Sequence, residues 1–404
     1  MALPASFCRR RLGYGEDVTR VFSFLRGVFW LAVVVGLVFY LGGGWFFSEQ
    51  IRSDALEIDP RVPIFDLEVA AVDGASITLN DNATMDANLR SEGTFGIDWR
   101  TGYGQVGAIL DDTPTSVTRT FTLVSGSPVK PGDKVDVEGF AFPADPSVTL
   151  GPTVEDVVYQ SPLGGLAAWY LPGADDSWVI HVHGKGASPR EALRAARGIA
   201  EAGYPQLLIT YRNDAGQPQD ATGFYQYGRT EWVDLEGAVA YALENGASDV
   251  VVFAYSTGGA LALSFLYESG RAESAKGLIL DAGNIDFGAT LDYGASQRDL
   301  PLLPYKVPGS LSTVAKFIAE IRFGIDFEEL DYVARADELD VPVLAFHGAE
   351  DDVVPIGTSR RLAEARPDLV ELVEMDGAGH VLSWNTDPAA YEAQVADFLA
   401  RVAG

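Results

Sequence analysis

The sequence predicts an α/β fold with a mostly parallel sheet flanked by helices, preceded by a transmembrane helix and a small β-rich domain. Three observations lead to this expectation. From residue 154 to residue 404, apolar runs of strand length alternate with stretches of helix length. Residues 61–153 contain short alternating runs separated by turn signals. Residues 27–48 are uncharged over a length that can cross a bilayer.

The first apolar segment, residues 27–48, is expected to be an uncleaved signal anchor. Its 22 residues carry no charge, and a helix of that length covers a hydrocarbon core of about 30 Å. Five arginines precede it, whereas residues 49–59 carry four acids and one arginine. The positive-inside rule therefore predicts a cytoplasmic tail over residues 1–26 and an extracytoplasmic location for the rest.

Two alternatives to this membrane anchor stay open. A cleaved signal peptide would fit the N-terminal position, but the apolar run is long and no A-x-A site follows it. A buried helix of a soluble protein would also be apolar, but such a helix rarely lacks a polar stripe for so long.

Composition limits the partners of the chain. Its 404 residues include 57 acidic and 29 basic side chains, which gives a net charge of −28. Such a surface repels phosphate backbones, so nucleic acid is not expected as a partner. Cys8 is the only cysteine, which excludes an intrachain disulfide and fits no metal-binding spacing. With a hydrophobic fraction of 47%, the chain can build a large core.

Between the anchor and the α/β region we expect a short polar linker, residues 49–60, and a β-rich accessory domain, residues 61–153. The stretch FDLEVAAVDGASITL contains two alternating runs joined at Asp73-Gly74, which indicates a hairpin. The stretches SVTRTFTLV and KVDVEGFAF alternate in the same way. We find no helix pattern and no candidate catalytic residues in this region.

The α/β region, residues 154–404, alternates strand and helix patterns along its whole length. Strands are expected at DVVYQS, LAAWYL, SWVIHVHG, YPQLLITY, DVVVFAY, AKGLILDAG, VPVLAFHG and LVELVEM. Helices are expected at SPREALRAARGIAEAG, EWVDLEGAVAYALENGA, TGGALALSFLYES, TSRRLAEAR and DPAAYEAQVADFLARVA. In the first helix, Ser188 is expected as the N-cap, Pro189 as the first helical residue and Glu191 as the capping-box partner.

A serine stands where one of these strands turns abruptly into a helix. In FAYSTGG, Ser256 follows the strand and falls at the carboxyl edge of the sheet, where open α/β sheets place their ligands. The small residues Ala254 and Gly258 relieve the crowding of so sharp a turn. The new helix also directs its N–H groups toward the same space, which suits an oxyanion. The alternative is that Ser256 is only a helix N-cap.

A serine nucleophile needs a base, and the base needs an orienting acid. Asp351 follows the strand VPVLAFHG and His380 follows the last strand, so both fall in loops at the carboxyl edge of the sheet. The neighbouring acids Glu350 and Asp352 are alternatives for the orienting role, and the three acids together could be a solvated turn. Their spacing with the histidines is not that of a dedicated metal site.

With these motifs in place, residues 154–404 resemble an α/β-hydrolase. That family carries G-x-S-x-G and a triad in the order serine, acid, histidine. Here the first motif reads AYSTG, with alanine for the first glycine. The family's H-G-x-x-D-x-x-V-P matches HGAEDDVVP, and its histidine turn matches GAGH. The resemblance implies a catalytic triad of Ser256, Asp351 and His380.

The stretch HGKG, residues 183–186, matches the family's oxyanion loop. The resemblance implies that the backbone N–H groups of Lys185 and Thr257 form the oxyanion hole. It also implies that these four residues shape the surrounding loops: His183, Gly184, Gly186 and Gly258. The Lys185 side chain either contacts a substrate carboxylate or faces solvent.

The same resemblance implies a cap insertion at about residues 284–340, which contains the amphipathic stretch LSTVAKFIAEIRFG. Four apolar residues of the cap could shield an acyl or aryl group, or could simply pack the cap onto the core: Phe317, Ile318, Ile321 and Phe323. The segment 211–235, which follows the fourth strand, could form another wall of the pocket.

The function implied is that of a membrane-anchored serine hydrolase, which cleaves a small-molecule carboxylic ester or thioester through an acyl-enzyme without metal or organic cofactor. Three alternatives stay open: a serine peptidase acting on short exported peptides, a catalytically inactive membrane-tethered binding module, and an acyltransferase to envelope sugars or lipids. Fold analogy does not choose the substrate.

Overall fold

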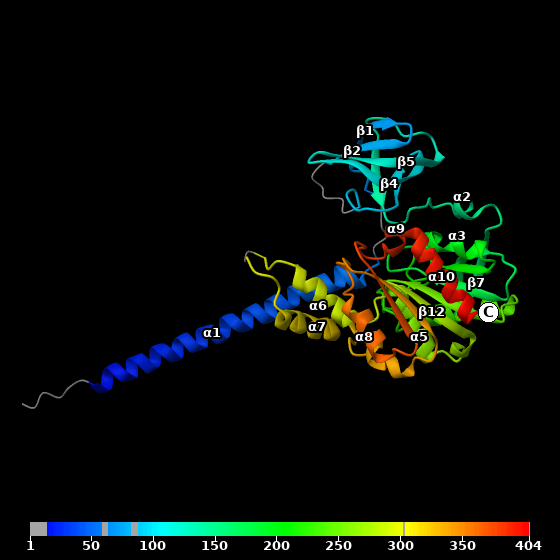
Figure 1. The fold of residues 1–404 in the computed structure, drawn as a ribbon. Helices are drawn as coiled ribbons and strands as arrows, with labels where there is room; N and C mark the ends of the chain where they lie inside the picture. The colour runs from blue at the N-terminus through cyan, green and yellow to red at the C-terminus, as the bar shows by residue number, and fades with distance from the viewer. Residues whose placement is uncertain (1–13, 59–63, 82–87, 302–303, 404) are drawn as a thin grey trace, which may run out of the picture.

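The computed structural model describes residues 14–58, 64–81, 88–301 and 304–403 (Figure 1). The first half of the expected cytoplasmic tail, with Cys8, lies outside these ranges, as do residues 59–63 of the region expected to hold the linker and the start of the β-rich domain. The described chain forms a long N-terminal helix, a β-barrel and a larger α/β domain.

The N-terminal helix α1 spans Tyr14–Gln50 and projects away from the remainder of the chain (Figure 1). Within the described residues, one helical stretch, Arg20–Leu56, is long and apolar enough to cross a membrane by length and composition. A signal sequence or a core helix can meet the same criteria, but the apolar window of this stretch is not buried in the protein. The helix is therefore a membrane candidate with its apolar side chains uncovered.

The linker expected at residues 49–60 differs from the structure. Helix α1 continues to Gln50, and a π-helical segment, η1 (Ile51–Leu56), follows directly. Leu56 is 1% exposed and belongs to the core of the α/β domain. Polar composition suggested a linker, but the few apolar side chains in this segment hold it against the protein.

The β-rich region forms a closed barrel in the order β1-β2-β5-β4-β3-β6. Its strands are β1 (Leu67–Asp73), β2 (Ser76–Asn80), β3 (Phe95–Trp99), β4 (Gly102–Thr113), β5 (Ser116–Gly126) and β6 (Lys134–Glu138). The expected hairpin is present, with Gly74 at φ +57° in its turn. A short helix that we did not expect, α2 (Pro146–Leu150), follows the barrel.

The α/β domain is built on an eight-stranded sheet in the order β14-β13-β12-β11-β9-β10-β8-β7. All neighbouring strands are parallel except at β8, which is antiparallel to both of its neighbours. The strands are β7 (Glu155–Ser161), β8 (Gly164–Leu171), β9 (Ser177–Val182), β10 (Gln206–Ile209), β11 (Asp249–Tyr255), β12 (Ala275–Asp281), β13 (Val343–Gly348) and β14 (Val370–Met375). All eight expected strand runs are therefore found.

Helices cover both faces of this sheet, as its apolar strands require. One face packs against α3 (Leu193–Glu201) and α10 (Pro388–Val402), with Phe253 among the buried strand residues. The other packs against α4 (Trp232–Glu244), α5 (Thr257–Glu268) and α8 (Gly357–Ala365), with Val252 in its core. A short helix, α9 (Ser383–Thr386), follows the last strand.

Ser188 is the N-cap residue and Pro189 the first helical residue, as expected, but the expected capping box is wrong. Residues Pro189–Ala192 form a 3₁₀ turn, η2, and Ser188 makes no side-chain cap hydrogen bond. The Glu191 carboxylate accepts a hydrogen bond from the Gly184 backbone N–H at 2.7 Å. The Glu191 carboxylate therefore binds the backbone of the HGKG loop instead of capping the helix as the local pattern predicts.

The cap region contains a helical hairpin of α6 (Phe287–Gln297) and α7 (Gly309–Phe323). This hairpin lies beside the C-terminal part of α1 (Figure 1). A 3₁₀ segment, η4 (Tyr332–Glu338), leads back to the sheet. Helix α7 was expected from its amphipathic pattern, whereas α6, with three glycine or serine residues among its eleven, was not.

Candidate active site

Ser256 lies in the tight turn between β11 and α5. Its backbone angles, φ 47° and ψ −118°, are a combination that residues other than glycine rarely adopt. A Cβ at Gly258 would collide with the Val182 carbonyl, so only glycine lets the helix start this close to β9. The Ser256 carbonyl accepts hydrogen bonds from the N–H groups of Gly259 and Asn284, at 2.9 and 2.8 Å. Hydrogen bonds from α5 and from the segment after β12 thus hold the strained turn in place.

The structure brings Ser256, Asp351 and His380 together. The His380 Nε2 atom lies 2.9 Å from Ser256 Oγ, and its Nδ1 atom lies 2.8 Å from Asp351 Oδ2. Asp351 comes from the loop after β13 and His380 from the loop after β14, both at the carboxyl edge of the sheet. The alternative acids Glu350 and Asp352 are exposed, whereas Asp351 is 4% exposed. The geometry therefore selects Asp351 as the partner of the imidazole.

Asp351 is held as an anion. Burial opposes its ionisation, but hydrogen bonds from His347 and His380 outweigh that effect and hold the pKa of Asp351 well below its usual value. The Oδ1 atom also accepts the backbone N–H groups of Val353 and Val354, each at 2.8 Å. An ionised carboxylate at this place fixes the imidazole with Nδ1 protonated and Nε2 facing the serine.

The HGKG loop lies against the serine. A Cβ at Gly184 would stand 3.0 Å from Ser256 Cβ, and Gly186 has a φ of +66° that favours glycine. The cleft at Ser256 is lined by Lys185, Gly186 and Thr257 among others. The Lys185 ammonium group donates to the Asp54 carbonyl at 2.9 Å, so its side chain binds the segment after α1. The Lys185 side chain is therefore not a free solvent-facing group, and its contact with a substrate carboxylate stays a prediction.

His183 is buried beneath this loop. Its Nδ1 atom is 2.8 Å from the Gly184 carbonyl, and its Nε2 atom is 2.8 Å from Asp214 Oδ2. Both ring nitrogens therefore face acceptors. Burial lowers the pKa of His183, but the Asp214 carboxylate beside it more than compensates and raises the pKa above the usual value. A protonated His183 would donate to both acceptors and hold the loop carbonyl in place.

The remaining histidines have structural partners. His347 contacts Ser359 Oγ at 2.8 Å and the Val354 carbonyl at 3.0 Å, so it braces the loop that carries Asp351. His181 lies inside β9, and burial lowers its pKa to about 4. Within the described ranges, no group of three or more His, Cys, Asp or Glu side chains is placed to hold a metal ion.

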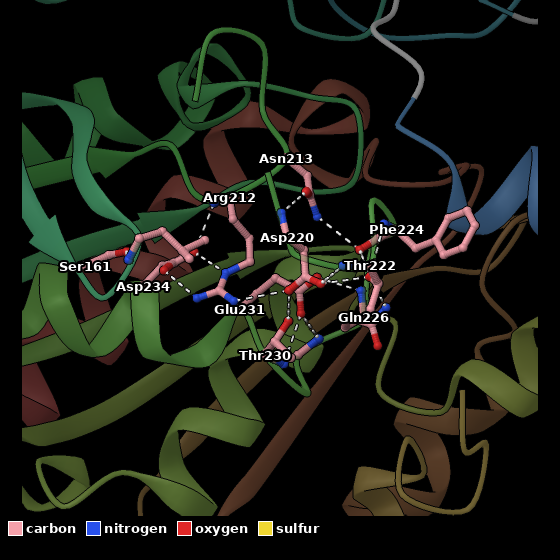
Figure 2. Close-up of polar contacts among 12 residues, drawn as sticks. Ser161, Arg212, Asn213, Asp220, Thr222, Phe224, Gln226, Thr230, Glu231 and Asp234 are labelled. Carbon is pink, nitrogen blue, oxygen red and sulfur yellow. Dashed lines mark hydrogen bonds and ion pairs between the residues drawn. The ribbon is translucent and has the colours of Figure 1, made fainter. Parts of the chain in front are cut away.

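A buried polar network fixes the segment after β10 that we expected to wall the pocket. Figure 2 shows Arg212 between Asp234 and Asp220, with N–O distances of 2.8 and 3.3 Å. Glu231 accepts the backbone N–H groups of Gln226 and Gly228, at 2.6 and 3.1 Å. A buried network in which each charge has a partner holds its backbone tightly. This loop in turn carries Asp214 and Tyr227.

The cleft above Ser256 has a volume of about 640 Å³. Ser256 and His380 lie on its wall together with residues of the cap and, unexpectedly, of the N-terminal segment: Phe47, Gln50, Ile51, Asp54 and Ala55. Tyr227, on the loop after β10, donates to the Ala55 carbonyl at 2.8 Å. No sequence signal placed residues 47–55 at this site, because their apolar and polar composition fits an anchor and a linker equally well.

The four apolar cap residues expected to shield a substrate do not line this cleft. Phe317 and Ile321 are 59% and 71% exposed. Ile318 lies against Gly44 of α1, and Phe323 packs edge-on against Phe224 with ring centroids 5.9 Å apart. The cap contributes other apolar side chains instead: Phe287, Leu291, Ala295, Val307 and Ala315.

Comparisons with known proteins match the two domains separately. Residues 68–138, which span the barrel strands, match a family described as a domain of unknown function (DUF8805). An uncharacterised protein of Bacillus subtilis (strain 168), YqkD, is 24% identical over 228 residues, which are 55% of this chain and 70% of that protein.

Among solved structures, an esterase of Pyrococcus furiosus, Pf2001, is 20% identical with a TM-score of 0.49 and covers 62% of this chain and 92% of its own. A putative aryl esterase from Burkholderia cenocepacia is 18% identical with a TM-score of 0.44 and covers 61% and 99%. A bromoperoxidase from Bacillus anthracis is 17% identical with a TM-score of 0.44 and covers 61% and 100%.

The strand order and the serine turn of this chain define the class of its larger domain. The sheet of parallel strands with one antiparallel member, and the tight turn between β11 and α5, are those of an α/β-hydrolase fold. The serine, acid and histidine follow one another in the chain in the order of that fold. The barrel and α1 are additions to this fold at its N-terminal side.

Proposed function

We propose that the protein is a serine hydrolase that cleaves a carboxylic ester or thioester through an acyl-enzyme. The observation that carries the proposal is the chain of two contacts, 2.9 Å from Ser256 Oγ to His380 Nε2 and 2.8 Å from His380 Nδ1 to Asp351 Oδ2. An imidazole oriented by a buried carboxylate is the group that makes a serine nucleophilic.

In the first step, His380 Nε2 takes the proton of Ser256 Oγ while the oxygen attacks the substrate carbonyl carbon. The backbone N–H groups of Lys185 and Thr257 would stabilise the negative oxygen that forms, and loss of one such donor costs about 3 kcal/mol of transition-state stabilisation. The imidazolium then returns the proton to the leaving alcohol or thiol. In the second step, His380 activates a water molecule, which releases the acid and restores the serine.

The test is covalent labelling of the full chain in detergent with a fluorophosphonate probe, followed by assay with p-nitrophenyl butyrate. We expect labelling and hydrolysis in the native protein and neither in Ser256→Ala. Ser248→Ala is the matched control, because Ser248 lies at the opposite end of β11 and is exposed. No labelling of Ser256 in the native protein would refute the proposal and favour a binding module, and undiminished labelling of Ser256→Ala would assign the nucleophile to another residue.

The membrane-anchored state is part of the proposal, with the N-terminus in the cytoplasm and the α/β domain outside. It is supported by the uncharged segment 27–48, the arginines before it and the uncovered apolar surface of α1. The sole cysteine, Cys8, allows a direct test in intact cells with a membrane-impermeant maleimide. We expect Cys8 to react only after permeabilisation.

The control for this topology experiment is Ser248→Cys in a Cys8→Ser background. Ser248 is exposed on the α/β domain, so the introduced thiol should react in intact cells. Reaction of Cys8 before permeabilisation would reverse the proposed orientation.

A further inference from the structure

We propose that the substrate of this site is a membrane-resident amphiphile, an ester whose long acyl chain reaches Ser256 from within the bilayer, along the junction of α1 with the α6–α7 hairpin. The inference rests on the proposed function and names its substrate class. Three features of the structure support it: the packing of α1 on α7, the depth of that contact relative to the anchor, and the extent of the cleft.

Helix α7 runs beside the last part of α1. Near its start, Ser310 Oγ lies 2.9 Å from the Tyr40 hydroxyl, and near its end the Arg322 guanidinium contacts Glu49 at 2.6 Å. Between these points, a Cβ at Gly44 would stand 2.7 Å from Val314, so the two helices are in close contact. The start of α7 is therefore level with Tyr40, inside the uncharged segment.

This contact places the hairpin at the membrane surface. The uncharged residues before the contact, 27–39, extend only about 20 Å as a helix, whereas the hydrocarbon core is about 30 Å thick. Residues 40–48 are therefore needed for the crossing, and α7 begins beside them. Apolar side chains remain uncovered on the two helices and in the segment before α7: Leu41, Trp45, Phe46, Phe317 and Ile321 on the helices, and Tyr305 before α7. Lipid at the interface would cover them.

The cleft joins this junction to the serine. Phe47 and Ile51 from the N-terminal segment and Val307 and Ala315 from the hairpin line the same cleft as Ser256. Phe47, Val307 and Ala315 also form a small apolar cluster with Leu311, which lies against Gly43 of α1. An acyl chain lying along these residues would extend from the catalytic serine toward the bilayer.

Entry from the bilayer also has an energetic advantage. When a lipid leaves the membrane, each CH₂ group that becomes exposed to water adds to the free-energy cost. A route along α1 keeps the chain beside the apolar side chains of Phe47, Val307 and Ala315 on its way from the bilayer, so a long chain need not pass through bulk water. A soluble ester with a short chain would gain little from such a route.

The experiment compares lateral entry with entry through water. The full chain is reconstituted in vesicles of ether-linked phosphatidylcholine, which offers no ester of its own, and p-nitrophenyl palmitate is supplied in the same vesicles or in separate ones. Because transfer between vesicles requires desorption, we expect the rate in shared vesicles to be about tenfold higher or more. Equal initial rates in the two arrangements would overturn the proposal.

A double variant, Phe317→Asp with Ile321→Asp, tests the membrane-facing side of α7. We expect it to lose about fivefold in palmitate ester hydrolysis in shared vesicles, since two interfacial apolar contacts are replaced by charges. Val158→Asp is the matched control, because Val158 is also 59% exposed but lies on the edge strand β7. A double variant as active as the control on the vesicle-bound ester would contradict the proposal.

Hydrolysis of p-nitrophenyl butyrate separates failure of this inference from failure of the proposed function. The double variant should cleave this soluble ester at the native rate. If the native protein cleaves the soluble ester but is no faster in shared vesicles, the membrane route is refuted and the proposed function stands. If the native protein neither cleaves the soluble ester nor is labelled at Ser256, both the proposed function and the membrane route are refuted.

Discussion

At the scale of single residues, the strained backbone of Ser256 and the buried charge of Asp351 both position groups for the proposed chemistry. The turn exposes the serine oxygen at the cleft, and the carboxylate orients the one imidazole that reaches it. Both arrangements are costly for a folded chain, and each persists here because the surrounding backbone satisfies it with hydrogen bonds.

Asp351→Asn should show what the carboxylate contributes. An amide cannot stabilise the imidazolium and favours the wrong tautomer, so kcat should fall by about 10³–10⁴-fold with little change in fold. Ester hydrolysis and the circular dichroism spectrum are the two measurements. A loss of less than about tenfold would assign the orienting role elsewhere.

The same carboxylate makes a prediction about acid stability. Because the pKa of Asp351 is depressed in the folded protein, its contribution is fully present above its usual pKa of 3.8 and is lost as the pH falls toward the folded value. The native thermal midpoint should therefore decline more steeply below about pH 4 than that of Asp351→Asn. Parallel pH profiles of the two proteins would contradict this assignment.

At the scale of elements, the barrel is connected to the loop that carries His380. The Asn385 amide donates to the carbonyls of Thr94 and Gly139 in and beside the barrel, at 2.7 and 2.9 Å. Leu382, two residues after His380, packs against the barrel core. Arg194 of α3 donates to the Val381 carbonyl at 2.5 Å. The barrel and its flanking residues thus contact the segment that follows His380.

Asn385→Ala should therefore affect catalysis as well as stability. It removes a donor from the carbonyls of Thr94 and Gly139 and the Oδ1 acceptor of the Arg194 guanidinium, which costs about 1–3 kcal/mol, and it releases the His380 loop. We expect kcat to fall by about 10–100-fold with KM for p-nitrophenyl butyrate almost unchanged, since small misplacements of a catalytic group have effects of that size.

The control for this variant is Asn245→Ala, which removes an exposed hydrogen bond to the Tyr241 carbonyl at the end of α4. It should change the thermal midpoint slightly and leave kcat at the native value. If each asparagine variant lowers kcat only in proportion to its loss of stability, the barrel has no positioning role.

At the scale of the whole molecule, helix α1 continues directly into a segment that packs in the α/β domain. Deleting residues 1–38 removes the part of α1 before its contact with α7 and should leave a protein that cleaves p-nitrophenyl butyrate at the native rate. Deleting residues 1–56 also removes Leu56 from the core and the Ala55 carbonyl from Tyr227. Loss of a buried leucine alone costs about 2–5 kcal/mol, so this variant should be inactive with a much lower thermal midpoint.

Thermal unfolding and esterase assays on the two truncated proteins provide the comparison. Equal activity in both would mean that the α/β domain folds without residues 39–56, as a linker at residues 49–60 would allow. That result would restore the interpretation based on composition alone.

The sequence by itself determined the class of the sheet, the uncharged segment and the three residues that meet at Ser256. These features depend on local pattern, because strand runs, turn glycines and motif spacing are properties of neighbouring residues. The tertiary structure alone decided the wall of the cleft and the supports of the His380 loop. Phe47, Ile51 and Asn385 act through residues far away in the chain, and no periodicity or spacing records which distant surface a side chain meets.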